Sequence, residues 1–429
     1  MPEADSTIAT TPAAAADVNA AAVDPAVVPT IERIRDAARV LAPLAARTPM
    51  EHSRYLASVI GSPVHLKCEN LQRTGSYKIR GASYRLSRLS PEERARGVVA
   101  ASAGNHAQGV AFAARQLGIA ATIFMPMGVA LPKLEATRDY GANVVLAGDV
   151  VDESLAAAKR YAEETGAVFI PPFDHPDVIA GQGTVGLEIL EDVPDVDTIV
   201  VPIGGGGLIS GVASAVKQLA PHVRIIGVQA ENAAAYPASL AAGEPRTVKT
   251  SPTIADGIAV GTPGRITFAI VQQLVDEVVT VSDDETASAL LVLLERAKLV
   301  VEPAGAVGIA ALMSGKIANP GRTVAVLSGG NIDPLMMERV ISRGLVASDR
   351  YMTLRIGLPD RPGQLAVISG LISEANANVV EVLHTRHGTG TQISEVQIDI
   401  SVETRGKPHQ AVVMSRLEEA GYHPRVIVT

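Results

Sequence analysis

Short runs of β-branched residues alternate with amphipathic helical segments along most of this chain, and this alternation constrains the fold more than any other feature. The predicted strands stand at 98–101, 121–126, 143–148, 198–204, 224–231 and 323–330. Uncharged Val and Ile runs separated by helices are typical of parallel sheets covered on both faces. Because the alternation is too long for one sheet, we predict an α/β protein with two such sheets.

The alternation of single strands and helices ends at Asp349–Arg350. From there, strand and helix patterns follow one another in the order βαββαβ over residues 351–429. This order is the split βαβ, ferredoxin-like plan. It is short, complete and C-terminal, so we predict a separate module here.

Length and N-terminal composition set the remaining boundaries. A chain of 429 residues corresponds to roughly two to four domains. Residues 1–28 are Ala-rich and open with acidic residues, so we expect a disordered tail and no secretory signal. Helical spacing begins at Thr30. Since no stretch of 18 uncharged apolar residues occurs, no membrane-spanning helix is predicted.

The net charge, the few aromatic residues and the single cysteine limit which partners and which compartment are expected. The net charge of −8 argues against binding to polyanions, and 8 Tyr, 5 Phe and no Trp leave few rings for stacking on single-stranded nucleic acid. We therefore expect neither a nucleic-acid nor a membrane partner. The single cysteine, Cys68, cannot form an internal disulfide, which indicates a reducing compartment, the cytoplasm.

Three glycine-bearing segments follow predicted strands, where open α/β sheets place ligands. SAGNHAQGVA (102–111) starts a helix whose unpaired N–H groups suit an anion, with simple capping by Ser102 as the alternative. PIGGGGLISG (202–211) lets a phosphate approach the backbone, or is only a flexible connection. It is not a P-loop, because no Lys-Ser/Thr follows the glycines. LSGGNID (327–333) is a further ligand loop or a plain turn.

One lysine stands upstream of these segments. Lys78 lies in NLQRTGSYKIRGA (70–82), among small and apolar neighbours. A lysine is most often a charged surface residue, with a pKa near 10.4. Partial burial would make the neutral amine accessible, and a neutral amine can form a Schiff base. A Schiff-base lysine, a glycine phosphate loop and a polar strand end together indicate a pyridoxal phosphate site.

The combined motifs resemble the threonine dehydratases (threonine ammonia-lyases) among the fold type II pyridoxal phosphate enzymes, whose fold is like that of tryptophan synthase β. The matching segments are GSYKIRGA (75–82), SAGNHAQGVA (102–111), GGGGLISG (204–211), VEPAGAVG (301–308) and LSGGNID (327–333). The C-terminal module resembles an ACT regulatory domain, with PDRPGQL (359–365) at its first strand–helix junction. The resemblance implies a catalytic region at 29–346, with a small domain at roughly 67–170 inserted in a larger one.

The resemblance also implies roles at the cofactor. Lys78 would hold pyridoxal 5′-phosphate as a Schiff base, and Tyr77 would lie beside its ring. Asn105 would bond the ring 3′-oxygen and Ser328 would face the pyridine nitrogen. The phosphate would be bound by Gly204, Gly205, Gly206 and Gly207. The substrate carboxylate would be held at the helix N-terminus by Ser102, Gly104, Asn105 and His106.

The expected reaction is dehydration and deamination of L-threonine to 2-oxobutyrate and ammonia. The freed Lys78 amine would remove the α-proton as general base, so Lys78 and Ser328 are the expected catalytic residues. Because Ser328 is neutral, it would not hold the ring nitrogen protonated as a carboxylate would, which favours prompt β-elimination. L-serine differs by one methyl group and is an expected side substrate.

Two alternative functions remain open at this point. Serine racemases carry a second hydroxyl at the position of Ala103, and a methyl group cannot move protons, so racemisation is expected to be weak. An inactive amino-acid sensor is the alternative of another class, although the presence of Lys78, Asn105 and Ser328 argues against it. Some relatives bind a cation near QAEN (229–232), but Glu231 is one carboxylate alone, so no metal site is predicted.

The ACT resemblance implies an amino-acid effector held at a subunit interface. The candidate residues are Asp360, Gly363 and Asn378, and a plain structural turn is the alternative. Pairing of edge strands across subunits would make a homodimer or homotetramer. Both isoleucine biosynthesis and threonine catabolism fit the sequence, and the effector stays unassigned.

Overall fold

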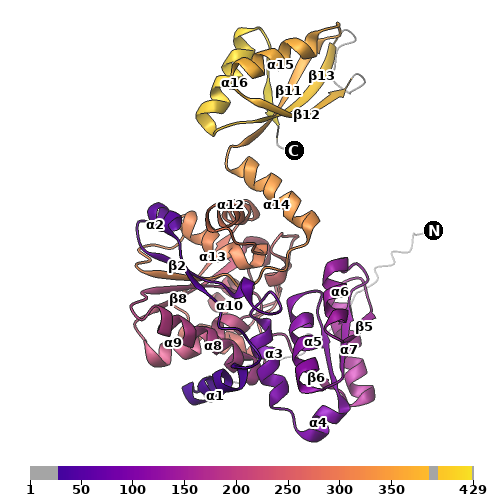
Figure 1. Cartoon of the computed structure of the whole chain (residues 1–429), viewed down its shortest axis with the longest axis vertical. Helices are drawn as coiled ribbons and strands as arrows, with labels where there is room; N and C mark the ends of the chain where they lie inside the picture. The colour runs from indigo at the N-terminus through magenta and orange to yellow at the C-terminus, as the bar shows by residue number, and fades with distance from the viewer. Residues whose placement is uncertain (1–27, 386–394, 428–429) are drawn as a thin grey trace, which may run out of the picture.

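The computed structural model describes residues 28–385 and 395–427. All but the last residue of the predicted tail at 1–28 lies outside the described residues. Within these described ranges, no helix is both long and apolar enough to cross a membrane. The chain forms two α/β units and a C-terminal α+β module, which is joined to them through helix α14 (Pro334–Ala347) (Figure 1).

The larger unit is built on a six-stranded sheet in the order β1-β2-β10-β7-β8-β9. Its strands are β1 (Met50–His52), β2 (Val64–Lys67), β7 (Thr198–Pro202), β8 (Arg224–Ala230), β9 (Glu277–Val281) and β10 (Thr323–Val326). All neighbours run parallel except β1, which pairs antiparallel with β2 at the edge. The prediction of a parallel sheet is confirmed for β7, β8 and β10, which lie where strands were predicted, whereas β2, β9 and the antiparallel β1 were not predicted.

Helices cover both faces of this sheet because successive side chains of each strand point to opposite faces. On β7, Ile199 and Val201 join a core with α8, α9 and α11, whereas Val200 joins one with α2, α12 and α13. The helices of this unit are α1 (Ile31–Leu41), α2 (Arg54–Ile60), α8 (Pro176–Asp192), α9 (Gly207–Leu219), α10 (Ala235–Ala242), α11 (Arg265–Leu274), α12 (Asp283–Val292) and α13 (Pro303–Met313). Short helical turns are η2 (Glu69–Leu71), η3 (Glu231–Ala233), η4 (Asp256–Ile258) and the π-helix η5 (Leu293–Ala297).

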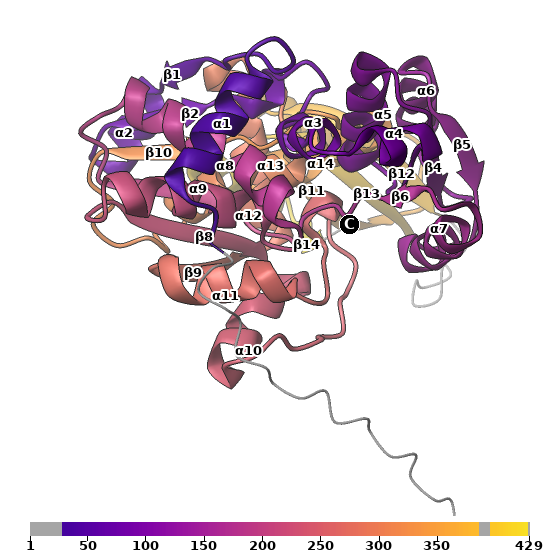
Figure 2. The same ribbon diagram turned by 90° about the horizontal axis from the view of Figure 1, so that it is seen from below.

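The smaller unit has a four-stranded parallel sheet in the order β5-β4-β3-β6. Its strands are β3 (Val98–Ala101), β4 (Ala121–Met125), β5 (Asn143–Leu146) and β6 (Val168–Phe169). Its helices are α3 (Lys78–Ser87), α4 (Pro91–Arg96), α5 (Asn105–Leu117), α6 (Leu131–Asp139) and α7 (Val151–Thr165). Helix α3 packs against α5 on one side and α8 on the other, so it lies where the two units meet (Figure 2).

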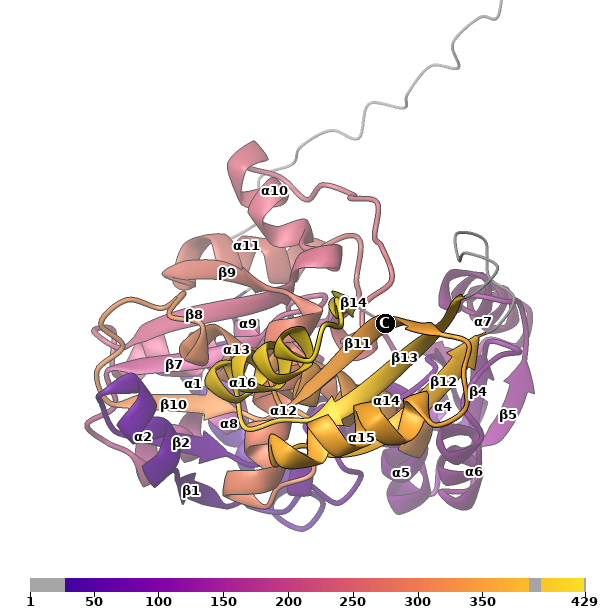
Figure 3. The ribbon, with the colours of Figure 1, turned by 90° about the horizontal axis from the view of Figure 1, so that it is seen from above.

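The C-terminal module is an antiparallel sheet with two helices on one face (Figure 3). Its elements are β11 (Tyr351–Pro359), α15 (Gln364–Glu374), β12 (Asn378–Thr385), β13 (Glu395–Glu403), α16 (Lys407–Glu419) and β14 (Arg425–Ile427). The strand order is β12-β13-β11-β14. The predicted βαββαβ, ferredoxin-like plan is therefore confirmed.

Candidate active site

The segments before Lys78 and after β10 run side by side. The backbone N–H of Tyr77 donates to the carbonyl of Ser328 (3.1 Å), and that of Gly330 donates to the carbonyl of Gly75 (2.8 Å). Helix α3 then begins at Lys78. Two of the motifs picked out in the sequence are thus joined by backbone hydrogen bonds, although about 250 residues separate them.

The amine of Lys78 lies in a partly enclosed position between the two units. Its Nζ donates to the carbonyl of Pro172 (3.0 Å) and lies 5.3 Å from the centre of the Tyr77 ring. Burial lowers the pKa of Lys78 to about 8, against the opposing pull of the Glu302 carboxylate. At pH 7 roughly one amine in ten is then neutral, compared with fewer than about one in a thousand for an ordinary lysine.

The glycine loop has no room for side chains. A Cβ on Gly205 would lie 2.3 Å from the Phe173 ring, and one on Gly207 would lie 2.8 Å from Cβ of Phe173. Gly206 also has a φ of +96°, which L side chains rarely adopt. Because Phe173 follows Pro172, the same short segment contacts the glycine loop and holds the Lys78 amine.

Two hydroxyl groups set the direction of the loop's peptide groups. Thr267 Oγ1 and Tyr236 Oη donate to the carbonyl of Gly205 at 2.6 and 3.2 Å. In a trans peptide the next N–H points the opposite way, so that of Gly206 points away from both hydroxyls. Across the described ranges, the N–H groups of Gly204 to Gly207 have no acceptor within the protein. Helix α9 starts here, so the loop suits an anion.

Asn105 opens helix α5 and lies between two polar partners. Its Nδ2 donates to Glu302 Oε1 (2.7 Å), and its Oδ1 accepts from Asn331 Nδ2 (2.8 Å). One Nδ2 hydrogen has no partner among these contacts. Asn105 therefore keeps a donor for a ligand oxygen.

The turn before α5 does not fit the alternative interpretation, in which Ser102 caps the helix. Ser102 does not cap the helix: the N-cap is Gly104, and the Ser102 hydroxyl accepts from the Gly104 N–H (3.1 Å). The His106 ring is buried and bonded to the carbonyl of Ile170 (2.9 Å). Burial and the nearby Lys78 charge lower the pKa of His106 to about 3, so the ring is neutral. A carboxylate at this turn would meet the N–H groups that open α5.

Ser328 follows β10 and is 3% exposed. Its carbonyl accepts from the Tyr77 backbone N–H, and among residues 28–385 and 395–427 no hydrogen bond involves its hydroxyl. The Ser328 hydroxyl is thus available to a polar ligand atom.

Sequence reasoning missed two charged features of the site. Glu302, in the VEPAGAVG segment, is 5% exposed and bonded to Asn105. Lys133 on α6 forms an ion pair with Asp256 of η4 (3.1 Å), which joins the two units beside Gly104. Glu302 could have been noticed because it lies in VEPAGAVG (301–308), one of the segments that match the family. However, an acidic residue before a proline is equally typical of an ordinary helix start.

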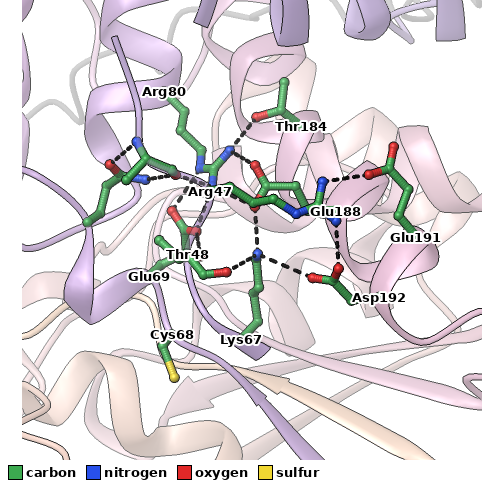
Figure 4. A network of polar contacts seen from close by, with 12 residues as sticks. Arg47, Thr48, Lys67, Cys68, Glu69, Arg80, Thr184, Glu188, Glu191 and Asp192 are labelled. Carbon is green, nitrogen blue, oxygen red and sulfur yellow. Dashed lines mark hydrogen bonds and ion pairs between the residues drawn. The ribbon is translucent and has the colours of Figure 1, made fainter. Parts of the chain in front are cut away.

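A buried ion cluster fixes helix α3 behind the site (Figure 4). Arg80 donates to the carboxylates of Glu69 and Glu188 and to the hydroxyl of Thr184. Lys67 pairs with Glu188 at 2.6 Å. These residues come from the larger unit on either side of Arg80, which stands two positions after Lys78.

These residues fit a cofactor with a phosphate, a polar ring and an aldehyde. The glycine loop leaves its N–H groups unpaired, the Ser328 hydroxyl and one Asn105 hydrogen are free, and the Lys78 amine is partly neutral. Such a site between two α/β units defines a cofactor-dependent enzyme whose cofactor forms an imine with lysine. The chain belongs to the family described as pyridoxal-phosphate dependent enzymes, whose model matches residues 41–329, and an ACT domain matches residues 352–421.

Individual relatives agree with this assignment. The chain is 50% identical to an L-threonine ammonia-lyase of Thermotoga maritima over 93% of its own length and 99% of that protein. It resembles the solved structures of tomato (Solanum lycopersicum) threonine deaminase isoform 2 (39% identity, TM-score 0.70, covering 73% of this chain and 92% of that one) and of maize serine racemase (38%, TM-score 0.70, 74% and 98%). The predicted fold type II architecture is confirmed.

Glu231 is the residue considered above as a candidate cation ligand. Glu231 is exposed at the start of η3, after β8. No cluster of three or more His, Cys, Asp or Glu side chains able to hold a metal occurs in residues 28–385 and 395–427.

Proposed function

We propose that this protein is a threonine ammonia-lyase, which converts L-threonine to 2-oxobutyrate and ammonia with L-serine as a side substrate. The observation that carries the proposal is the partly neutral Lys78 amine, set between an anion-binding glycine loop and the free polar groups of Asn105 and Ser328. The names of the relatives support threonine as the substrate.

When bound, pyridoxal phosphate supplies an electron-withdrawing ring that lowers the cost of negative charge at the substrate α-carbon. The N–H groups of Gly204 to Gly207 would hold its phosphate at the start of α9. Asn105 would donate to the ring 3′-oxygen, Ser328 would bond the ring nitrogen, and Tyr77 would flank the ring. With these contacts, the phosphate of the cofactor would lie at the larger unit and its aldehyde carbon beside Lys78.

Lys78 Nζ would take the proton from the substrate α-carbon. Its lowered pKa favours this role, because a general base works best with a pKa near the working pH. The substrate carboxylate would lie at the start of α5 near Ser102 and Gly104, against the backbone N–H groups of Asn105 and His106. The neutral Ser328 hydroxyl contributes hydrogen bonding only, which favours loss of the β-hydroxyl over longer-lived carbanion chemistry.

The direct test is release of 2-oxobutyrate from L-threonine by the pure, pyridoxal phosphate-loaded protein. Pyruvate formation from L-serine, measured in parallel, gives the side activity. Discrimination between the two by a factor of about 10–200 is expected for one methyl group. A protein that takes up the cofactor but turns over neither amino acid would contradict the proposal and favour an amino-acid sensor.

Replacing Ala103 with serine is expected to raise serine racemisation. Ala103 is half-buried in the turn before α5, and its methyl group cannot carry a proton between the two faces of a substrate. A hydroxyl there would supply the second acid–base group, and such groups contribute about 10²–10⁴-fold. Chiral chromatography of serine after incubation measures the change, with Ala101→Ser on β3 as the control. Appreciable racemisation by the unaltered protein would mean that another group already does this.

We further propose the domain limits 29–346, with a small domain at roughly 67–170, and 351–429 for the regulatory module. The ACT domain would bind an amino acid near Asp360, Gly363 and Asn378. Gly363 is the N-cap of α15 with a φ of +91°, and no atom lies within 4 Å of a Cβ placed there. The open space beside Gly363 and the positive end of the α15 dipole suit an amino-acid carboxylate.

A ligand at this position should alter catalysis. Arg350, directly before the ACT domain, forms an ion pair with Glu295 of the π-helix η5 in the catalytic region. Calorimetric titration of the whole enzyme with the common amino acids is expected to identify an effector that shifts threonine affinity by about 5–150-fold. Gly363→Val should weaken its binding, whereas Gly370→Val, on the middle of α15, serves as the control. Binding unaffected by Gly363→Val would place the effector elsewhere.

We also infer a homodimer or homotetramer that works in the cytoplasm. The edge strands β12 and β14 expose apolar side chains, with Leu383 61% and Val426 57% accessible, and such edges favour pairing between subunits. The lone Cys68 thiol is buried and free, in keeping with a reducing compartment.

A further inference from the structure

Glu302 stands at a helix start but does not act as a helix cap. It occupies the N-cap of α13 without a side-chain bond to that helix. Its carboxylate is instead turned toward the site and buried, and within the described ranges Asn105 Nδ2 is its one hydrogen-bond donor, at 2.7 Å. A buried carboxylate held by a single neutral amide is costly. Its retention there points to a role in the site.

The surroundings leave room for this carboxylate. A Cβ on Gly329 would lie 2.3 Å from Glu302 Oε1, so any larger residue at 329 would displace it. The backbone N–H of Glu302 donates to the Gly329 carbonyl (3.0 Å), which fixes the start of α13 against the loop after β10. The position of the carboxylate is therefore determined from two sides.

Glu302 and Asn331 together determine which way the Asn105 amide faces. Asn331 Nδ2 donates both to Asn105 Oδ1 (2.8 Å) and to the Thr74 carbonyl (2.8 Å), so it can only be a donor toward Asn105. A flipped Asn105 would set its NH₂ against the Asn331 NH₂ and its oxygen against the Glu302 carboxylate. Both bonds would be lost and replaced by repulsion.

We propose that Glu302 is a positioning residue: by accepting one Nδ2 hydrogen of Asn105 it fixes the amide so that the other Nδ2 hydrogen faces the cofactor ring oxygen. This inference rests on the proposed function, since Asn105 acts there on the 3′-oxygen. Glu302 touches neither substrate nor cofactor in this role.

The charges around Glu302 suit an acceptor that need not carry a full charge. Burial, with the Asp256 carboxylate, raises the pKa of Glu302 to about 7, while Lys133, the Asn105 bond and Lys78 oppose the rise. In either protonation state one oxygen without hydrogen remains to accept from Asn105. An amide oxygen in the same place should serve nearly as well.

The test compares Glu302→Gln, which keeps an acceptor oxygen, with Glu302→Met, which keeps the length and removes the acceptor. The readouts are the affinity of the apoenzyme for pyridoxal phosphate and the visible absorption band of the loaded protein. We expect Glu302→Met to lower the affinity by about tenfold and to shift the band, and Glu302→Gln to remain within about threefold of the parent. Glu277→Met, at an exposed carboxylate on β9, is the matched control.

A double-mutant cycle with Asn105→Ala shows whether the effect passes through Asn105. In that background Glu302→Met should change the affinity less than twofold. Equal losses in both backgrounds, or a Glu302→Gln protein as impaired as Glu302→Met, would overturn the proposal. If Glu302→Met does not fold, Glu302→Gln alone tests the proposal. A loss of cofactor affinity beyond threefold in the otherwise unaltered protein overturns the proposal, and near-parental affinity with an unshifted absorption band supports it. Failure of threonine turnover in the unaltered enzyme would count against the proposed function alone, because both readouts are independent of substrate.

Discussion

Replacing Lys78 with alanine is expected to leave a folded protein that no longer turns over threonine. On the proposed function, the variant would lose both the amine that holds the cofactor and the base beside the substrate α-carbon. A positioned base alone contributes about 10²–10⁴-fold, so a loss of about 10⁴-fold or more is expected. Initial rates of 2-oxobutyrate release measure it, and circular dichroism checks the fold.

Borohydride reduction of the loaded protein, followed by peptide mapping, identifies the attached lysine. The structure offers two comparison residues. Lys67 is wholly buried and already paired with Glu188 and the Thr48 carbonyl. Lys133 is engaged with Asp256 at the edge of the site. The label is expected on Lys78, and a label on either of the others would contradict its assignment.

The layered fold and the neighbourhood of the site could be predicted from local patterns. Val and Ile runs fix where strands lie, and parallel strands bring their carboxyl ends to one edge of the sheet. This argument joins the segments after β7 and β10, which leave neighbouring strands of one sheet, whereas the segment after β3 leaves the smaller sheet and was joined to them by the family resemblance. The antiparallel edge strand β1 carries no such run, since its three residues are Met-Glu-His, and it went unpredicted.

Contacts between side chains that lie far apart in the chain could not be predicted from local sequence patterns. The partner of Glu302 lies 197 residues away, and nothing local shows that its carboxylate turns inward. Capping by Ser102 was the alternative interpretation, since serine favours that position, but Gly104, with an extended φ of −159°, is the N-cap. The desolvated setting of Lys78 was inferred from its small sequence neighbours, whereas the group that binds its amine, the Pro172 carbonyl, comes from another segment.

The cluster around Arg80 predicts the largest effect on stability. Arg80 is 2% exposed and its guanidinium binds two carboxylates, of which Glu69 is wholly buried. With Lys67 and Glu188, two positive charges face two negative ones. Removing one member of a buried pair leaves an uncompensated charge, which typically costs about 3–5 kcal/mol.

Arg80→Met is therefore expected to lower the free energy of unfolding by about 3–5 kcal/mol. In urea titrations this appears as a lower midpoint of unfolding. The substitution should also lower threonine turnover, because Arg80 anchors the first turn of α3, which carries Lys78. The matched control is Arg47→Met. Arg47 pairs with Glu191 and Asp192 at the surface, with its side chain 52% exposed, so its loss should cost under about 1 kcal/mol. Equal losses in the two variants would refute the cluster's role.

The deficit of Arg80→Met should shrink as the pH falls from 7 to 5. Burial alone would raise the pKa of the Glu69 carboxyl, but Arg80, Thr48 and Lys67 hold it below its ordinary value. The parent protein therefore keeps its stabilising charge until the pH drops below that lowered pKa. Without Arg80, burial dominates and the folded-state pKa rises above the unfolded one, so the variant binds a proton on folding and gains stability as the pH falls. Urea midpoints of both proteins at pH 7, 6 and 5 measure this convergence. A deficit that stays constant would mean that Glu69 remains charged in the variant and that Lys67 alone compensates it.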